Sequence, residues 1–185
     1  MQIIGLAGKK RSGKDTIYSI ASGVLEGRVG RVGFADAVKH EVSEATGFRM
    51  DFIEEHKKDF RSLLQVWGTE FRRNLCGNEY WIERMADVLK ASEGHYDYIF
   101  ITDVRFDNEC EFIKNQGGQV VRVERRLESY KNLSEIEAFD SHSSENSLND
   151  YSHYDYVLNN DGTERELNDS VVLMLETLNI SKNAA

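Results

Sequence analysis

The sequence predicts an α/β fold of three layers, in which helices flank a mostly parallel sheet of five strands. Short apolar runs alternate along the chain with segments of helical periodicity, a pattern typical of strand–helix–strand units. The 185 residues suit one domain, and 40% hydrophobic with 30% charged residues suit an ordinary globular core. No apolar run approaches the roughly 20 residues that span a bilayer, so we expect a cytoplasmic protein without a membrane segment.

The five predicted strands are short runs rich in aliphatic and aromatic residues. The first strand, residues 2–7, ends at Gly8, and the third, residues 98–102, ends at Asp103. The other strands are predicted over residues 31–34, 119–124 and 156–158. Apolar runs of this length are typical of strands that are buried on both faces of a parallel sheet.

Six helices are predicted, and three of them begin at a capping residue. Asp36 is expected to cap a helix over residues 37–46, and Asp59 a longer helix that ends near Leu75. Further helices are predicted over residues 14–26, 79–92 and 107–116, and from the capping box of Thr163 and Glu166 to Leu178.

Apolar stripes at spacings of three and four predict which helix faces point inward. In the helix from Asp59 the stripe consists of Leu64, Trp67, Phe71 and Leu75. In the helix over 79–92 it consists of Trp81, Met85, Val88 and Leu89. In the last helix it consists of Leu167, Val171, Met174 and Leu178. Residues 127–153 lack such a pattern and are polar, which predicts a flexible flap with one short helix.

The clearest functional motif lies between the first strand and the first helix. Residues 8–14 read Gly-Lys-Lys-Arg-Ser-Gly-Lys, which is G-x-x-x-x-G-K in the strand–loop–helix context that it requires. The glycines let successive N–H groups point at phosphate oxygens, the helix adds its positive end, and Lys14 reaches the β- and γ-phosphates. The alternative is a chance glycine–lysine turn. The motif predicts an ATP site formed by Gly8, Arg11, Ser12, Gly13, Lys14, Asp15 and Thr16.

The residue after Lys14 is Asp15, where a serine or threonine usually holds Mg²⁺. A carboxylate is a hard oxygen ligand, and Mg²⁺ accepts such a ligand directly or through water. We therefore expect Asp15 and the Thr16 hydroxyl to share the binding of Mg²⁺ and nucleotide.

The phosphoryl acceptor is expected at the carboxyl ends of the parallel strands, where ligands of such sheets collect. Asp103 and Arg105 follow the strand over 98–102, and the guanidinium of Arg105 can bind two oxygens of a phosphate. Arg125 and Arg126 follow the next strand and enter the polar flap, where arginines of a lid stabilise developing charge. The alternative for Asp103 and Arg105 is an ion pair at the surface. The alternative for Arg125 and Arg126 is a solvated basic pair without a functional role.

Other candidates are less specific. Arg61, Gln65 and Arg72 share one face of the predicted helix from Asp59, and this face either meets the acceptor or is simply exposed. Trp81 and a flap histidine, His142, are further candidates, although tryptophan is more often a core residue and a lone loop histidine is usually solvated.

A series of motifs resembles the phage-type deoxynucleoside monophosphate kinases, which also carry Asp after the loop lysine. The series starts with the loop at 8–16 and runs in order over most of the chain. Its later members are Phe34-Ala35-Asp36 with Lys39, Leu64-Gln65 with Gly68-Thr69-Glu70, Tyr80-Trp81-Ile82, Thr102-Asp103-Val104-Arg105 with Glu109, residues 121–125, His142 with Ser144-Glu145, and Asn160-Asp161-Gly162-Thr163. Each is weak alone, and their order is the specific signal.

The resemblance implies an adenylate-kinase-like P-loop fold that transfers the ATP γ-phosphoryl group to a deoxynucleoside 5′-monophosphate. It implies a core at about 1–34, 95–125 and 154–185, an acceptor-binding helical region at about 35–94 and a lid at about 126–153. Catalytic roles would fall to Lys14, Arg105 and Arg125. Acceptor binding would fall to Asp36, Lys39, Gln65, Arg72, Trp81, Asp103, Arg105, Glu109 and His142.

Two other functions remain open from the residues themselves. One is a P-loop kinase for another small molecule, of the dephospho-coenzyme A or phosphomevalonate type. The other is a regulatory P-loop ATPase without an acceptor, although an Asn-Lys-x-Asp base-reading motif is absent from the sequence. The net charge of −9 argues against a nucleic-acid partner, and the widely separated Cys76 and Cys110 favour reduced thiols. A homodimer is left open.

Overall fold

The computed structural model describes residues 1–126, 147–148 and 150–180. The chain divides into two compact units. The sheet unit comprises residues 1–31 and 94–185, and the helical unit comprises residues 32–93. No helix within the described ranges is long and apolar enough to cross a membrane.

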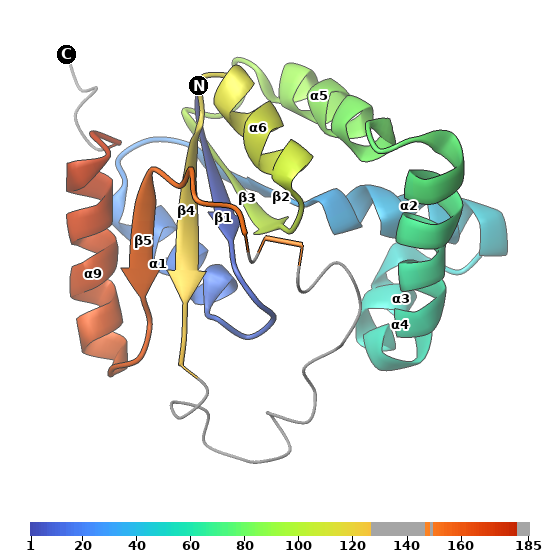
Figure 1. The fold of residues 1–185 in the computed structure, drawn as a ribbon, viewed down its shortest axis with the longest axis horizontal. Coiled ribbons are helices and arrows are strands. Elements are labelled where there is room, and N and C mark those ends of the chain that lie inside the picture. Colours follow the sequence, from blue (N-terminus) through green and yellow to red (C-terminus); the bar gives the residue numbers. More distant parts are fainter. Residues whose placement is uncertain (127–146, 149, 181–185) are drawn as a thin grey trace. The chain divides into compact units, whose positions relative to one another are not determined.

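The sheet unit is built on five strands in the order β2-β3-β1-β4-β5 (Figure 1). The strands are β1 (Gln2–Ala7), β2 (Val29–Val32), β3 (Tyr98–Val104), β4 (Gln119–Glu124) and β5 (Tyr156–Asn159). The pairings of β1 with β3, of β1 with β4 and of β4 with β5 are parallel. The predicted sheet of five mostly parallel strands is therefore confirmed, with β2 shifted by two residues from its predicted place.

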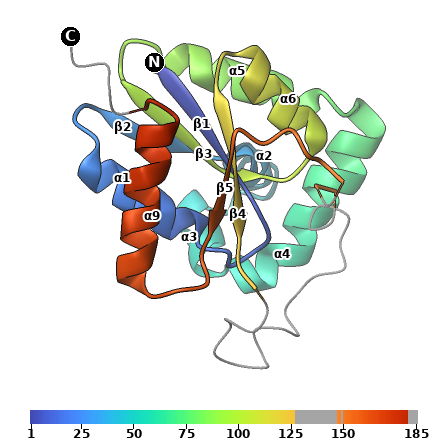
Figure 2. The same ribbon diagram turned by 60° about the vertical axis from the view of Figure 1, so that its left-hand side comes forward.

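Helices cover both faces of this sheet, because strands that are apolar on both sides must be covered on both. The described residues of the sheet unit form the helices α1 (Lys14–Val24), α6 (Asp107–Asn115) and α9 (Glu164–Thr177). Helices α1 and α9 bury Ile4 and Leu6 on one face, and α6 contacts the other (Figure 2). Gly5 lies under α6, since a Cβ there would come within 2.6 Å of the Ile113 side chain.

The helical unit consists of four α-helices and one π-helix. They are α2 (Phe34–Thr46), α3 (Met50–Glu55), α4 (Lys57–Gln65), the π-helix η1 (Val66–Cys76) and α5 (Tyr80–Ser92). Gly47 ends α2 in the left-handed conformation, with φ of 75° and its N–H bonded to the Ser43 carbonyl. Helix α3 was not predicted from the sequence.

Two predicted helix starts were wrong. Helix α2 begins at Phe34, so Asp36 lies in its first turn and bonds to Lys39 instead of capping the helix. Helix α4 begins at Lys57, so Asp59 also lies inside the first turn. The final helix is correct, because Thr163 and Glu166 exchange capping-box hydrogen bonds and the whole predicted stripe of α9 is buried.

The inward stripe predicted for the helix from Asp59 is correct only in its first half, where Leu64 and Trp67 are partly buried. Leu75 is 75% exposed and Phe71 is exposed as well. The reason is the change from α-helix to π-helix at Val66, because i→i+5 hydrogen bonds put more residues in each turn and rotate a stripe spaced for an α-helix. In α5, Trp81, Met85 and Leu89 are buried as predicted, whereas Val88 is exposed.

Candidate functional site

The site of the sheet unit forms at the carboxyl ends of its strands. Strand β1 leads into residues 8–13, β3 into Arg105, β4 into Arg125 and β5 into Asn160. Because the strands are parallel, these four ends lie along one edge of the sheet, where ligands of such folds bind.

The loop after β1 has the backbone of a phosphate-binding loop. Gly8, Arg11 and Gly13 all have positive φ angles, of 154°, 63° and 103°. Helix α1 begins directly after Gly13, so its positive end closes the loop. The Lys14 ammonium donates to the carbonyl oxygens of Gly8 at 2.7 Å and of Lys9 at 2.8 Å. An anion at the loop would thus meet backbone amides and one fixed ammonium group.

Residues of the neighbouring strands β4 and β5 leave no room for a side chain at the two glycines of the loop. A Cβ on Gly8 would lie 2.4 Å from the backbone oxygen of Val123, and a Cβ on Gly13 would lie 2.2 Å from Nδ2 of Asn160. Asn160 Nδ2 donates to the Ser12 carbonyl at 2.8 Å. Sequence reasoning noted Asn160 only as part of a motif, because nothing local indicates a contact with a residue 148 positions away.

The two arginines after β4 make different contacts. Arg125 Nη1 donates to the Arg11 carbonyl at 3.5 Å. The Arg126 N–H donates to Asp161 Oδ1 at 2.6 Å, and its side chain forms an ion pair with the same carboxylate. Arg125 therefore lies beside the phosphate loop, whereas Arg126 connects β4 to the turn after β5.

The first turn of α1 carries the two predicted Mg²⁺ ligands. The side chains of Asp15 and Thr16 are both exposed, and Asp15 Oδ1 lies 3.6 Å from Nε of Arg31. Among the described residues there is no group of three or more His, Cys, Asp or Glu side chains that could enclose a metal ion. These residues fit Mg²⁺, which usually keeps several waters and binds through one or two carboxylates together with substrate phosphates.

Arg105 follows β3, and its peptide is held on both sides. The Glu109 carboxylate is 2% exposed and accepts the N–H groups of Arg105 at 2.8 Å and of Phe106 at 3.2 Å. The Ser147 hydroxyl donates to the Arg105 carbonyl. Glu109, predicted to bind the acceptor, thus lies buried against the backbone that carries Arg105.

Asp103 lies inside β3 rather than after it. Strand β1 pairs Gly5 with Ile101 but Ala7 with Val104, so β3 holds one extra residue near its end. Such a bulge bends a strand and re-aims the neighbouring side chains, which a run of apolar residues does not reveal.

In the helical unit, Lys39 is a buried ammonium between two carboxylates. It is 8% exposed and lies 2.8 Å from Asp36 Oδ1 and 2.9 Å from Glu54 Oε2. Burial alone lowers the pKa of Lys39, but the hydrogen bonds and charges of both carboxylates raise it above its ordinary value. Hydrogen bonds from Lys39 and then Lys57 lower the pKa of Glu54 to about 2. The predicted acceptor residues Asp36 and Lys39 are therefore brought together.

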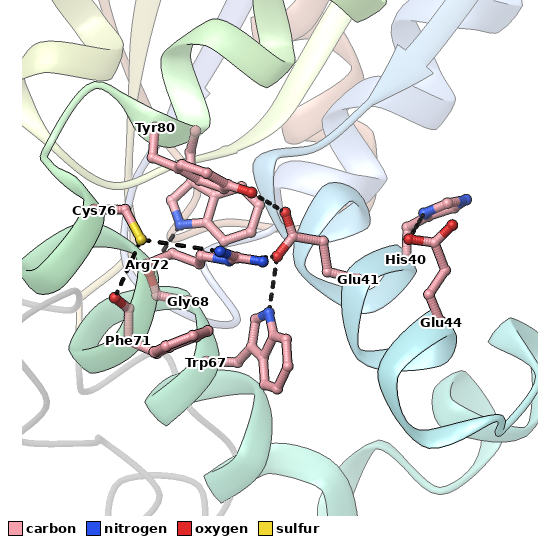
Figure 3. Close-up of polar contacts among 10 residues, drawn as sticks. His40, Glu41, Glu44, Trp67, Gly68, Phe71, Arg72, Cys76 and Tyr80 are labelled. Carbon is pink, nitrogen blue, oxygen red and sulfur yellow. Dashed lines mark hydrogen bonds and ion pairs between the residues drawn. The ribbon is translucent and has the colours of Figure 1, made fainter.

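Arg72 belongs to a cluster around Glu41 of α2 (Figure 3). Glu41 accepts hydrogen bonds from Trp67 Nε1 at 2.9 Å, from Arg72 Nε at 2.7 Å and from the Tyr80 hydroxyl. Burial raises the pKa of Glu41, but these hydrogen bonds and the Arg72 charge outweigh it and hold the pKa below its ordinary value. Sequence reasoning missed Glu41, because its partners lie on η1 and α5.

Of the remaining predicted residues, three lie in the helical unit and are buried or partly buried. Trp81 is 3% exposed, and its Nε1 donates to the Gly68 carbonyl in η1 at 2.8 Å, so the indole packs within the helical unit. Gln65 is the last residue of α4 and is partly buried. Arg61 is partly buried on the same helix. His142 lies outside the described residues.

Comparison with known proteins identifies the family of the chain. A family model described as deoxynucleotide monophosphate kinase matches residues 35–171. A protein of Acanthamoeba polyphaga mimivirus whose name gives it this same activity is 28% identical over 93% of this chain and 95% of its own. The deoxynucleotide monophosphate kinase of Enterobacteria phage T4 is 29% identical over 64% of this chain and 46% of that protein.

A solved structure supports the fold separately. The structure of a sugar kinase from Janibacter sp. HTCC2649 matches 98% of this chain and 96% of its own with a TM-score of 0.57 at 13% identity. The chain therefore has the P-loop kinase fold. Since the family model covers most of the sequence, the chain belongs to the deoxynucleotide monophosphate kinase family.

Proposed function

We propose that the chain transfers the γ-phosphoryl group of ATP to a deoxynucleoside 5′-monophosphate, releasing ADP and the deoxynucleoside diphosphate. The observation that carries this proposal is the family match over residues 35–171, in a chain whose first strand ends in a phosphate loop. No observation favours another acceptor or a regulatory ATPase over this activity.

The ATP phosphates bind the loop over residues 8–13 and the first turn of α1. Lys14 neutralises charge on the β- and γ-phosphates, and its ammonium already lies against the loop. Asn160 supports the loop from the end of β5. Electrostatic stabilisation by such fixed groups is the main means of catalysis in phosphoryl transfer.

Mg²⁺, when bound with ATP, supplies further neutralisation of the β- and γ-phosphates. Asp15 and Thr16 are the residues that would hold it, because both are exposed in the turn that follows Lys14. Both nucleotides carry several negative charges and do not cross a bilayer unaided, so we propose the cytoplasm for this activity.

Arg105 of the sheet unit is proposed to bind the phosphate of the acceptor. Its peptide is fixed by Glu109 and Ser147, which supports a defined position for the guanidinium. The reacting oxygen of the acceptor phosphate is ionised at neutral pH, so no strong base is required. This oxygen forms the new bond to the γ-phosphorus while the bond to the β–γ bridging oxygen breaks, and ADP leaves with that electron pair.

In the helical unit, Asp36, Lys39, Gln65 and Arg72 are proposed to contribute to acceptor binding. Arg125 is proposed to stabilise charge on the transferred group, because it lies beside the phosphate loop. Asp103 stays a proposal that rests on its place near the end of β3 and on the family motif, and His142 stays one that rests on the family motif alone. Trp81 is not retained as a contact because its indole is buried.

An acceptor panel tests the proposal. ADP formation from ATP and Mg²⁺ is measured with each deoxynucleoside monophosphate, each ribonucleoside monophosphate, dephospho-coenzyme A and no acceptor. We expect acceleration by at least one deoxynucleoside monophosphate. Turnover of another acceptor while every deoxynucleoside monophosphate fails, or ATP hydrolysis that no acceptor accelerates, contradicts it.

A further inference from the structure

Glu41 of α2 accepts hydrogen bonds from both η1 and α5. Its side chain is 17% exposed, and two of its three donors come from η1 and one from α5. A carboxylate has about four acceptor sites on its two oxygens, so it can serve three donors together. Oε2 receives Trp67 and Arg72, and Oε1 receives Tyr80 (Figure 3).

The same cluster fixes the guanidinium of Arg72 in position and in plane. Its Nε is bonded to Glu41, and its Cζ lies 4.9 Å from the Phe71 ring centroid and 4.8 Å from that of Tyr80. The Trp67 ring is 5.8 Å away. An arginine whose Nε is bonded and whose plane is flanked by rings has lost most of its rotational freedom.

Because Nε of Arg72 is bonded to Glu41, a ligand would bind the edge of the guanidinium that Nη1 and Nη2 form. Nη1 has a long contact of 3.9 Å with the Cys76 sulfur, and no hydrogen bond from Nη2 to another described residue is found. The side chain is 25% exposed. The two Nη groups form the fork that binds two oxygens of a phosphate.

We propose that Glu41 is a positioning residue for the kinase reaction: it holds Nε of Arg72 so that the Nη edge is preset for the phosphate of the acceptor. This inference rests on the proposed function and adds a residue to it. Glu41 itself does not touch the substrate. By holding Arg72 in one rotamer before the acceptor binds, Glu41 lowers the entropy cost of binding.

The competing explanation is that Glu41 only joins three helices. Under that explanation, loss of its charge lowers stability and leaves acceptor binding unchanged. The donors of the cluster separate the two explanations, because the Tyr80 hydroxyl reaches Glu41 without passing through Arg72. Removal of that hydroxyl weakens the cluster and keeps both the Arg72 bond and the aromatic ring.

The experiment is a double-mutant cycle of Glu41→Gln and Arg72→Ala, read as the KM for the best deoxynucleoside monophosphate, the KM for ATP and kcat. We expect Glu41→Gln to raise the acceptor KM about 10-fold and Arg72→Ala about 100-fold, with the ATP KM within about 2-fold. The double variant should match Arg72→Ala, because Glu41 acts through that residue.

Glu44→Gln is the matched control. It removes the same charge from the same helix, and its only described partner, His40, is an exposed i,i+4 neighbour at 3.6 Å (Figure 3). Tyr80→Phe is the stability control. We expect Glu44→Gln to behave as the wild type, and Tyr80→Phe to lower the melting temperature while the acceptor KM stays within about 3-fold.

Three results overturn the inference: an unchanged acceptor KM in Glu41→Gln, an effect that adds to that of Arg72→Ala, or an equal rise in the KM for ATP. If Glu41→Gln does not fold, Glu41→Asp replaces it with the same expected pattern, since the shorter side chain withdraws the carboxylate from Nε. A wild type that phosphorylates no deoxynucleoside monophosphate refutes the proposed function, whereas an active wild type without this coupling refutes only the role of Glu41.

Discussion

The phosphate loop and the Glu41 cluster are two polar sites that are built in opposite ways. The loop is made of backbone over residues 8–13, with glycines where any side chain would collide. The cluster is made of side chains from three helices, whose hydrogen bonds join residues 26, 31 and 39 positions apart. Backbone geometry tolerates little change, whereas a side-chain network can be rearranged. We infer that donor binding is fixed by the fold and that acceptor binding is open to variation.

The largest expected effect is at the loop lysine. Lys14→Met should lower kcat by about 1,000-fold or more, because it removes the fixed ammonium that stabilises the transferred charge. The measurement is acceptor-dependent ADP formation, with circular dichroism to verify folding. A folded variant that retains turnover would contradict the role given to Lys14 in stabilising the transferred charge.

Arg105 should come next. Arg105→Ala is expected to lower kcat/KM for the acceptor by about 100-fold while the Kd for ATP stays within about 2-fold, since a guanidinium fork on a phosphate is lost. Steady-state kinetics and ATP titration measure the two sides separately. A drop in ATP affinity would instead assign Arg105 to the donor.

Glycine substitutions test the claim that the loop is set by backbone. Gly13→Ala should destabilise the protein by about 1–3 kcal/mol and weaken ATP binding, because φ is 103° and the new Cβ would meet Asn160. Gly23→Ala lies in the same first helix with nothing within 4 Å, and should stabilise by up to about 1 kcal/mol. Thermal unfolding measures both, and equal effects would contradict the claim.

Glu109 should have a smaller effect that passes through Arg105. Glu109→Gln keeps one acceptor oxygen but loses the charge that binds two backbone N–H groups. We expect kcat/KM for the acceptor to fall about 10-fold, with no further fall in an Arg105→Ala background. If the two losses add, Glu109 acts on the acceptor directly, as the sequence suggested.

The smallest effect concerns the carboxylate beside Lys39. The pKa of Glu54 is lowered from 4.5 to about 2 in the folded chain. Its ionised form therefore stabilises the fold above pH 4.5, and this contribution is lost as the pH falls toward 2. Because Glu54 is half exposed, we expect less than about 1 kcal/mol. The fall in melting temperature from pH 6 to pH 3 should be about 2 °C smaller in Glu54→Gln. An identical fall in both proteins would contradict the ion pair.

Much of the sheet unit could be predicted from the sequence. The strands β1, β3, β4 and β5 were found because each is a compact apolar run, and α9 because its capping box and its stripe are local signals. The helical unit was predicted less well. The π-helix η1 broke the spacing on which the stripe from Leu64 to Leu75 depended, and the short α3 has no strong signal of its own.

The sequence by itself determined the phosphate loop and the parallel order of strand and helix around it, because glycine conformation and apolar periodicity are properties of neighbouring residues. Only the tertiary structure decided that Asn160 supports the loop, that Glu109 holds the Arg105 peptide and that Glu41 holds Arg72. Each of these is a hydrogen bond whose partner is chosen by how distant elements pack, and apart from Glu109 the pairs lie too far apart in the chain for local pattern to reveal them.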